Sequence, residues 1–196
     1  MDRENILPYD GKAIYIPDFI EKDKIEDLFN QLNTEIAFKK DVVKIFGRII
    51  ETKRLTAFYS KDNISYKYSG IEKKGLAYTN SLNDIDKKIK EILNLDFNSC
   101  LANLYPKGEA AMSWHSDDEK EMDKSFPIAS ISLGAVRRFV FRHKKTKEKV
   151  NINLDDGSLL LMYPETQVHW QHALPISKKV TEPRINLTFR KILKAD

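Results

Sequence analysis

The spacing of hydrophobic residues changes about halfway along the chain. In the first half, apolar residues recur every three or four positions over residues 25–36 and again over 85–93, which predicts two amphipathic helices. Asp23 is placed to cap the start of the first helix, and Ser81 with Asp84 resembles a capping box at the start of the second. We therefore expect two early helices, each with an apolar face to bury.

From about residue 97 onward, short alternating or wholly apolar runs replace the helical spacing. Val150, Ile152 and Leu154 alternate with polar residues, which is typical of a half-buried strand. The predicted strands are 14–16 before the first helix and then 100–105, 110–115, 128–133, 138–141, 150–154, 158–162, 168–172 and 185–190. The eight later strands predict a mostly β fold with flanking helices, a double-stranded β-helix (jelly roll) with the early helices packed on one sheet.

Composition is consistent with a single domain over residues 1–196. That length allows one sizeable core, and 41% hydrophobic residues suit a globular protein. The net charge of +4 permits a polyanionic partner without requiring one. No stretch approaches the about 20 apolar residues of a membrane span, and the polar start does not resemble a signal peptide. Cys100 is the single cysteine, so we expect a buried structural thiol in a soluble, intracellular protein without a membrane partner.

Histidine and aspartate residues form a candidate metal site. His115 and Asp117 are two positions apart, so on a strand both side chains point to the same face. Two imidazoles and one carboxylate are the ligands of the facial triad that holds non-haem Fe(II). The third ligand must come from a distant strand, and His169 and His172 are both candidates. Their parity places them on opposite faces of the predicted strand 168–172, and the spacing does not decide which face turns inward.

The last predicted strand alternates polar and apolar side chains. Its polar positions are Arg184, Asn186, Thr188 and Arg190, and its apolar positions are Ile185, Leu187 and Phe189. A guanidinium binds a carboxylate with two parallel hydrogen bonds, as a dicarboxylate co-substrate would need. An outward-facing polar stripe is the simpler interpretation, but it leaves the nearby metal-type residues unexplained. We therefore expect a carboxylate-binding wall beside a metal.

These motifs together resemble those of the AlkB family of Fe(II)/2-oxoglutarate dioxygenases. The resemblance rests on His115-Ser-Asp117, on His172, on the arginine strand 184–190 and on Asn103-Leu-Tyr105. The runs 127–134 and 138–143 are most similar to the branch of AlkB homologues that repairs alkylated double-stranded DNA. The resemblance is strong from about residue 100 to 191 and weaker from about residue 40.

The resemblance implies specific roles in binding metal and co-substrates. His115, Asp117 and His172 would ligate Fe(II), which favours His172 over His169. The residues that would bind 2-oxoglutarate are Asn103, Tyr105, Arg184, Asn186 and Arg190. Arg184 would hold the distal carboxylate, and Arg190 would lie near the end that chelates iron. With O2 as the other co-substrate, 2-oxoglutarate would yield succinate and carbon dioxide, and a ferryl species would hydroxylate the substrate within a catalytic core at about 97–191.

Acidic and aromatic residues are candidates for recognising the substrate. Asp118 and Glu119 follow the metal motif and suit a base made cationic by N-methylation, although an exposed acidic loop would look the same. By analogy with the family, Tyr68 would stack on a flipped-out base and Tyr66 would be its neighbour. Half-buried strand aromatics are the alternative interpretation of these two tyrosines.

A short apolar segment resembles the finger of the duplex-repairing branch. Ile45-Phe46-Gly47 would fill the gap that a flipped base leaves in a duplex, and Ile45 stands where the branch typically has Val. A core strand with a bulge at Gly47 would give the same pattern. Arg54 and the nearby lysines would neutralise phosphates. These residues place nucleotide-recognition hairpins at about 40–80.

The sequence and the resemblance thus predict oxidative demethylation of bases such as 1-methyladenine and 3-methylcytosine in DNA, with release of formaldehyde. We expect a monomer that acts on double-stranded DNA, with single-stranded DNA or RNA as further candidate substrates. It would act in the cytoplasm of a bacterium or the nucleus of a eukaryote. The alternatives are the same chemistry on RNA or on a protein side chain, and a jelly-roll binding module without catalysis.

Overall fold

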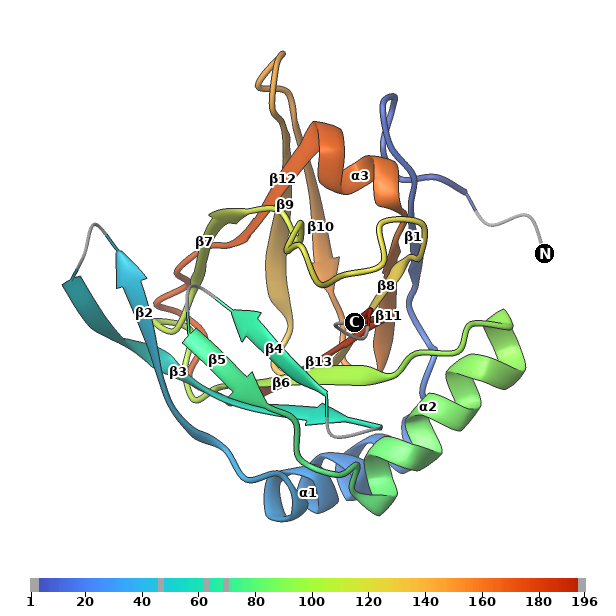
Figure 1. The fold of residues 1–196 in the computed structure, drawn as a ribbon, viewed down its shortest axis with the longest axis vertical. Helices are drawn as coiled ribbons and strands as arrows, with labels where there is room; N and C mark the ends of the chain where they lie inside the picture. The colour runs from blue at the N-terminus through green and yellow to red at the C-terminus, as the bar shows by residue number, and fades with distance from the viewer. Residues whose placement is uncertain (1–3, 46–47, 62–63, 69–70, 194–196) are drawn as a thin grey trace.

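Two facing sheets and a separate hairpin make up most of the fold (Figure 1). The structure is a computed structural model, which describes residues 4–45, 48–61, 64–68 and 71–193. The larger sheet has seven strands in the order β1-β11-β8-β13-β6-β3-β2, and the smaller has four in the order β10-β9-β12-β7. Paired strands of both sheets run antiparallel. The predicted jelly roll with flanking helices is confirmed.

The elements have the following bounds. The larger sheet contains β1 (Ala13–Ile16), β2 (Lys39–Ile45), β3 (Arg48–Ser60), β6 (Ser99–Tyr105), β8 (Ile128–Gly134), β11 (Ser158–Met162) and β13 (Arg184–Arg190). The smaller contains β7 (Met112–His115), β9 (Arg137–His143), β10 (Lys149–Leu154) and β12 (Trp170–Leu174). β4 (Ser65–Tyr68) pairs with β5 (Ile71–Lys74). The helices are α1 (Ile25–Glu35), α2 (Asn80–Leu93) and α3 (Pro164–His169), and a 3-10 turn (Lys22–Lys24) precedes α1.

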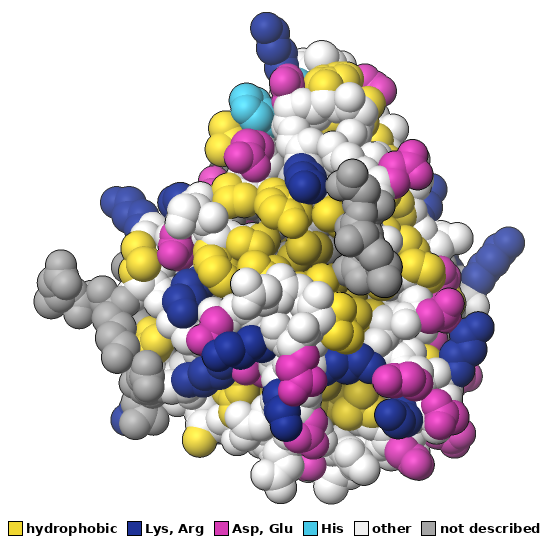
Figure 2. All heavy atoms as spheres, turned by 90° about the vertical axis from the view of Figure 1, so that its right-hand side faces the viewer, with side chains coloured by type: hydrophobic (Ala, Val, Ile, Leu, Met, Phe, Trp, Pro, Cys, Tyr) yellow, Lys and Arg dark blue, Asp and Glu magenta, His cyan; other side chains and the backbone are white. Residues whose placement is uncertain are grey.

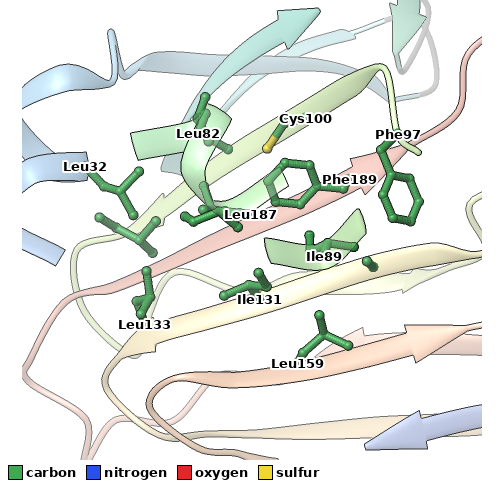
Figure 3. Packing of buried hydrophobic residues seen from close by; sticks show 14 of the residues in the cluster. Leu32, Leu82, Ile89, Phe97, Cys100, Ile131, Leu133, Leu159, Leu187 and Phe189 are labelled. Atoms are coloured by element: carbon green, nitrogen blue, oxygen red, sulfur yellow. The ribbon is translucent and has the colours of Figure 1, made fainter. Parts of the chain in front are cut away.

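The early helices pack on the outer face of the larger sheet, as their apolar spacing predicts. Leu32 on α1 and Leu82 and Ile89 on α2 are fully buried in one cluster with Leu187 and Phe189 on β13. Figure 3 shows these side chains meeting between the helices and the strands. A second cluster fills the space between the two sheets. The larger sheet is therefore covered on both faces.

The helix starts differ from the sequence-based prediction. Lys24, and not Asp23, stands at the N-cap of α1, where no side chain caps the helix. Asp23 lies in the preceding 3-10 turn. The cap of α2 is Thr79, whose side chain accepts a hydrogen bond from the Leu82 amide at 3.3 Å. Ser81 already lies inside the helix and donates its amide to Glu35, so the predicted capping box is wrong.

One predicted strand is wrong over its first residues. The strand expected at 168–172 begins only at Trp170, because the preceding residues form α3. Pro164 occupies the first turn of α3, where its fixed φ favours a helix. The hydroxyl of Thr166 then donates to the Lys12 carbonyl at 2.8 Å and fixes this turn against the N-terminal segment. The other predicted strands start and end within two residues of the observed ones.

The surface carries charges of both signs. Figure 2 shows hydrophobic side chains gathered across the middle of one face, with acidic and basic side chains interspersed below them.

Cys100 is fully buried, as predicted, and burial raises the pKa of its thiol. Across the ranges that the structure describes, every helix is too short or too polar to cross a membrane.

The helix-to-sheet contact gives a first prediction. Replacing Ile89, which is fully buried, with Ala should lower the free energy of unfolding by about 2–5 kcal/mol, because it leaves a cavity against the sheet. Ile92→Ala on the same helix is the matched control, since Ile92 is 48% exposed and its loss should cost less than about 0.5 kcal/mol. Chemical denaturation measures both. Equal losses would contradict the packing described above.

Candidate metal and co-substrate site

Neighbouring strands of the smaller sheet bring two histidines together. His115 on β7 and His172 on β12 are register partners, and their ring centroids lie 4.2 Å apart. Asp117 is the second residue after the end of β7 and is buried beside them. Its carboxylate oxygens lie 3.9 Å from His115 Nε2 and 3.8 Å from His172 Nε2. One donor atom from each residue thus points at a common centre.

The two histidine side chains are arranged to offer a lone pair to a metal. His115 Nδ1 lies 2.8 Å from the Ser113 carbonyl, which can only accept, so Nδ1 carries the proton and Nε2 offers its lone pair. Burial and the nearby His115 lower the pKa of His172 to about 3, against the opposing effect of Asp117. The His172 ring is therefore neutral at neutral pH, and neutral imidazole is the form that binds metal.

Asp117 is held as an ionised carboxylate. Burial by itself would raise its pKa, but Arg190 and the two histidines hold the pKa of Asp117 below its ordinary value. Arg190 Nη2 donates to Asp117 Oδ1 at 2.7 Å. The Asp117 amide donates to Gln167 Oε1 at 3.0 Å, which fixes the backbone at this point. Two imidazoles and one carboxylate fit Fe(II) and leave positions open for other ligands.

A second group of ligand-type residues lies elsewhere among the described residues. It consists of Asp10, His143 and the exposed His169. His143 Nδ1 accepts a hydrogen bond from the Thr146 amide at 3.1 Å, so the neutral ring carries its proton on Nε2, the atom nearest Asp10. The His143 ring therefore has no lone pair to offer at that position, and the group is a poorer metal site than the triad.

β13 supplies the polar wall predicted beside the metal. It pairs with β6 and β8, and Arg184 lies opposite Tyr105 while Asn186 lies opposite Asn103. Arg184 is 2% exposed, donates to Ser132 Oγ at 2.8 Å, and has its guanidinium 5.3 Å from the centre of the Tyr105 ring. Burial lowers the pKa of Arg184 to about 10, so it stays cationic at neutral pH.

Arg184 lacks a carboxylate partner within the described part of the chain. A buried cation without a counter-ion is costly, and a bound anion would relieve that cost. The wall is therefore suited to the carboxylate of a ligand that also reaches the triad.

The comparisons with known proteins agree with this geometry. Residues 12–190 match the family model described as the 2OG-Fe(II) oxygenase superfamily. The chain is 37% identical over 183 residues to the DNA oxidative demethylase ALKBH2 of Mus musculus, a match that covers 88% of this chain and 77% of that protein. It is 35% identical over 192 residues to the alpha-ketoglutarate-dependent dioxygenase alkB homolog 3 of Bos taurus, covering 93% and 66%.

The chain is an AlkB homologue of the 2OG-Fe(II) oxygenase superfamily. A solved structure, that of OsALKBH1, superposes on it with a TM-score of 0.68 at 14% identity, covering 94% of this chain and 99% of the other, which shows the shared fold. Membership of the superfamily makes the chain a dioxygenase that uses Fe(II), 2-oxoglutarate and O2.

One cavity between the sheets collects most of the predicted residues of this AlkB homologue. They are Arg54, Asn103, Tyr105, His115, Asp117, His172, Arg184, Asn186 and Arg190. Asn186 directs its amide nitrogen to Ser130 Oγ at 2.8 Å and to the Ile131 carbonyl at 3.0 Å. Its donors are thus engaged within the wall, and a direct contact with 2-oxoglutarate stays a prediction.

Several predicted residues lie elsewhere. Asp118 is exposed and lines a neighbouring cavity, while the half-buried Glu119 does not line the triad cavity. Phe46 and Gly47 lie outside the described residues. The same holds for the side chains of Ile45, Tyr66 and Tyr68, whose backbones belong to β2 and β4.

Arg54 corrects a further expectation. Its side chain is 3% exposed, lines the triad cavity and contacts Met112 Sδ. A guanidinium buried in this way is not an open surface charge for the phosphate backbone, because its neighbours shield it from solvent.

Sequence reasoning missed the side chains that support the site. Ser130 and Ser132 on β8 accept hydrogen bonds from Arg184 and Asn186. Their alternation with Ala129, Ile131 and Leu133 was the sequence pattern that could have indicated a polar face on this strand. The ring of Phe139 stacks on His172 with centroids 5.3 Å apart. Long-range contacts of this kind depend on strand order, which spacing along one strand does not reveal.

The two histidine candidates can be separated by metal binding. His172→Ala should abolish Fe(II) binding, because it removes one of the three ligands. His169→Ala should retain most of it, because His169 is exposed at the end of α3 and outside the triad. Anaerobic Fe(II) titration measures both variants. Loss of iron in His169→Ala with retention in His172→Ala would contradict the site.

Proposed function

We propose that this chain oxidatively demethylates N-alkylated bases, of the 1-methyladenine and 3-methylcytosine type, in DNA. The observation that carries the proposal is the meeting, in one cavity, of the His115–Asp117–His172 triad and the Arg184 wall. The relatives named DNA oxidative demethylase, at 37% identity over most of the chain, support DNA as the substrate. The methyl group would be hydroxylated and leave as formaldehyde, which restores the base.

Different residues of the cavity would bind the metal and the two ends of the co-substrate. Fe(II), held by the triad, would supply the oxidising chemistry when O2 and 2-oxoglutarate are bound. Arg184 would take the distal carboxylate, with Tyr105 and Asn103 beside it. Arg190, hydrogen-bonded to Asp117, would keep the metal carboxylate oriented and lie near the opposite end of the co-substrate. Burial of these groups keeps water away from the reaction.

The acidic residues that follow Asp117 in the chain are suited to an alkylated base. Glu119 Oε2 is buried and has no hydrogen-bond partner within the described ranges. A buried acceptor of this kind needs a donor, and the exocyclic amine of adenine or cytosine would provide one. The exposed Asp118 would add negative charge near a base made cationic by methylation. Tyr66 and Tyr68 on β4 remain our proposed stacking partners.

We also propose double-stranded DNA as the preferred form and a monomer as the acting species. β2 and β3 form an antiparallel pair in which Ile45 pairs with Arg48, and Phe46 and Gly47 are the two residues between them in the sequence. An apolar side chain at this position would fill the gap left by a flipped base. The protein would act where DNA is held, in the cytoplasm of a bacterium or the nucleus of a eukaryote.

A panel of oligonucleotides tests the proposal. Each would carry one methylated base, in single- and double-stranded DNA and in RNA, and formaldehyde release would be measured. We expect release from 1-methyladenine and 3-methylcytosine in DNA. Phe46→Ala should slow the duplex reaction by about tenfold or more and the single-strand reaction much less, because lost stacking is worth about a few kcal/mol.

Val136→Ala is the control for this variant, because it truncates an exposed apolar side chain outside β2 and β3. If no methylated DNA releases formaldehyde while methylated RNA or a protein does, the proposed substrate is wrong. If Phe46→Ala keeps full duplex activity, the finger is wrong and demethylation of DNA stands.

A further inference from the structure

Arg137 is a fully buried arginine of the smaller sheet that lies near Tyr105 but outside the cavity lining. It begins β9, is 1% exposed, and its guanidinium carbon lies 5.9 Å from the centre of the Tyr105 ring. The guanidinium carbon of Arg184 lies 5.3 Å from the centre of the same ring. Tyr105 thus contacts two guanidinium groups, of which only Arg184 lines the cavity.

The hydrogen bonds of Arg137 join two loops at this end of the sheets. Its Nη2 donates to the carbonyls of Gly108 at 3.2 Å, Ala110 at 3.0 Å and Pro175 at 2.8 Å. Gly108 and Ala110 follow β6, the strand that carries Tyr105, and Pro175 follows β12, the strand that carries His172. The side chain therefore fixes the ends of the strands on which the site depends.

The charge of Arg137 is not balanced within the described residues. It makes no ion pair there, and its Nε and Nη1 atoms are buried without a hydrogen-bond partner. A neutral donor could hold loop carbonyls at a lower desolvation cost than a buried cation. A buried cation at this position is better explained if it also attracts the neighbouring Tyr105 ring and an anion bound near Arg184.

We propose that Arg137 is a positioning residue for the distal carboxylate of the co-substrate. Its flat guanidinium holds the Tyr105 ring in place, and Tyr105 in turn holds Arg184 in the orientation that binds the carboxylate. This inference rests on the proposed role of Arg184. It predicts that replacing Arg137 weakens the binding of ligands with a distal carboxylate and leaves the affinity for other ligands unchanged.

Two related ligands test this selectivity. 2-Oxoglutarate carries the distal carboxylate, and 2-oxopentanoate has the same carbon chain without it. Dissociation constants for both would be measured by anaerobic calorimetry on Fe(II)-loaded protein. Arg137→Met should weaken 2-oxoglutarate by about tenfold or more, because a small misplacement of a binding group is costly, and should change 2-oxopentanoate by less than about twofold.

Arg138→Met is the matched control, because Arg138 is the next residue on β9 and is exposed. It should leave both constants unchanged. Arg137→Lys keeps the charge and one donor group without the flat fork, so it should show a smaller loss, at least about threefold, for 2-oxoglutarate alone. If Arg137→Met does not fold, the measurement on Arg137→Lys tests the proposal instead.

Equal weakening of both ligands, or wild-type affinity for 2-oxoglutarate in the folded Arg137 variants, would overturn the inference. A wild-type protein that binds Fe(II) but not 2-oxoglutarate would instead overturn the proposed function. The two failures are thereby distinguishable.

Discussion

The alternation of side chains along β13 is the constraint on which the rest of the structure depends. β13 lies at the centre of the seven-stranded sheet, and its seven residues are all buried. One face carries Ile185, Leu187 and Phe189 into the contact with α1 and α2, and the other carries polar groups into the cavity. A slip of one residue against β6 or β8 would place arginines among the helices, so the apolar face also fixes the register of the binding wall.

Most polar groups on the cavity side of β13 are hydrogen-bonded to neighbouring residues, and the remaining charge is suited to a bound ligand. Arg190 bonds to Asp117, Arg184 bonds to Ser132, and Asn186 bonds to Ser130. Among the described residues that line the cavity, Asp117 is the one carboxylate, whereas arginines approach from both β3 and β13. The excess of positive charge favours a dianionic ligand. The same charges keep Asp117 ionised for a metal, so binding of the metal and of the co-substrate depends on one set of contacts.

Much of this site could be predicted from sequence because its ligands follow local rules. The alternation over 184–190 expresses strand geometry, whereas Asp117 lies two residues beyond His115, where β7 has ended. The structure brings both motifs to one cavity. The choice of His172 over His169 could not be derived from parity, because α3 extends through His169 and the strand begins after it.

Features that depend on strand order escaped prediction. The 13 residues of β3, which bring Arg54 into the cavity, lack the regular alternation that marks a half-buried strand. Arg54 therefore looked like a surface charge. The serines of β8 contact the neighbouring strand β13, and the guanidinium of Arg137 on β9 contacts residues that follow β6 and β12. These partners are far away in sequence, and periodicity within one strand contains no information about such contacts.

The central claim is that one cavity binds Fe(II) through the triad and 2-oxoglutarate through Arg184. Anaerobic titration of the Fe(II)-loaded protein with 2-oxoglutarate, followed by the weak visible absorption band of the co-substrate on iron, tests it most directly. The account predicts a saturable band in the wild-type protein. In Arg184→Lys, iron binding should be unchanged. Half-saturation of the band should need about tenfold or more 2-oxoglutarate, because lysine lacks the planar pair of donors that arginine offers to a carboxylate. Absence of the band in the wild-type protein, or an unchanged titration in Arg184→Lys, would contradict the account.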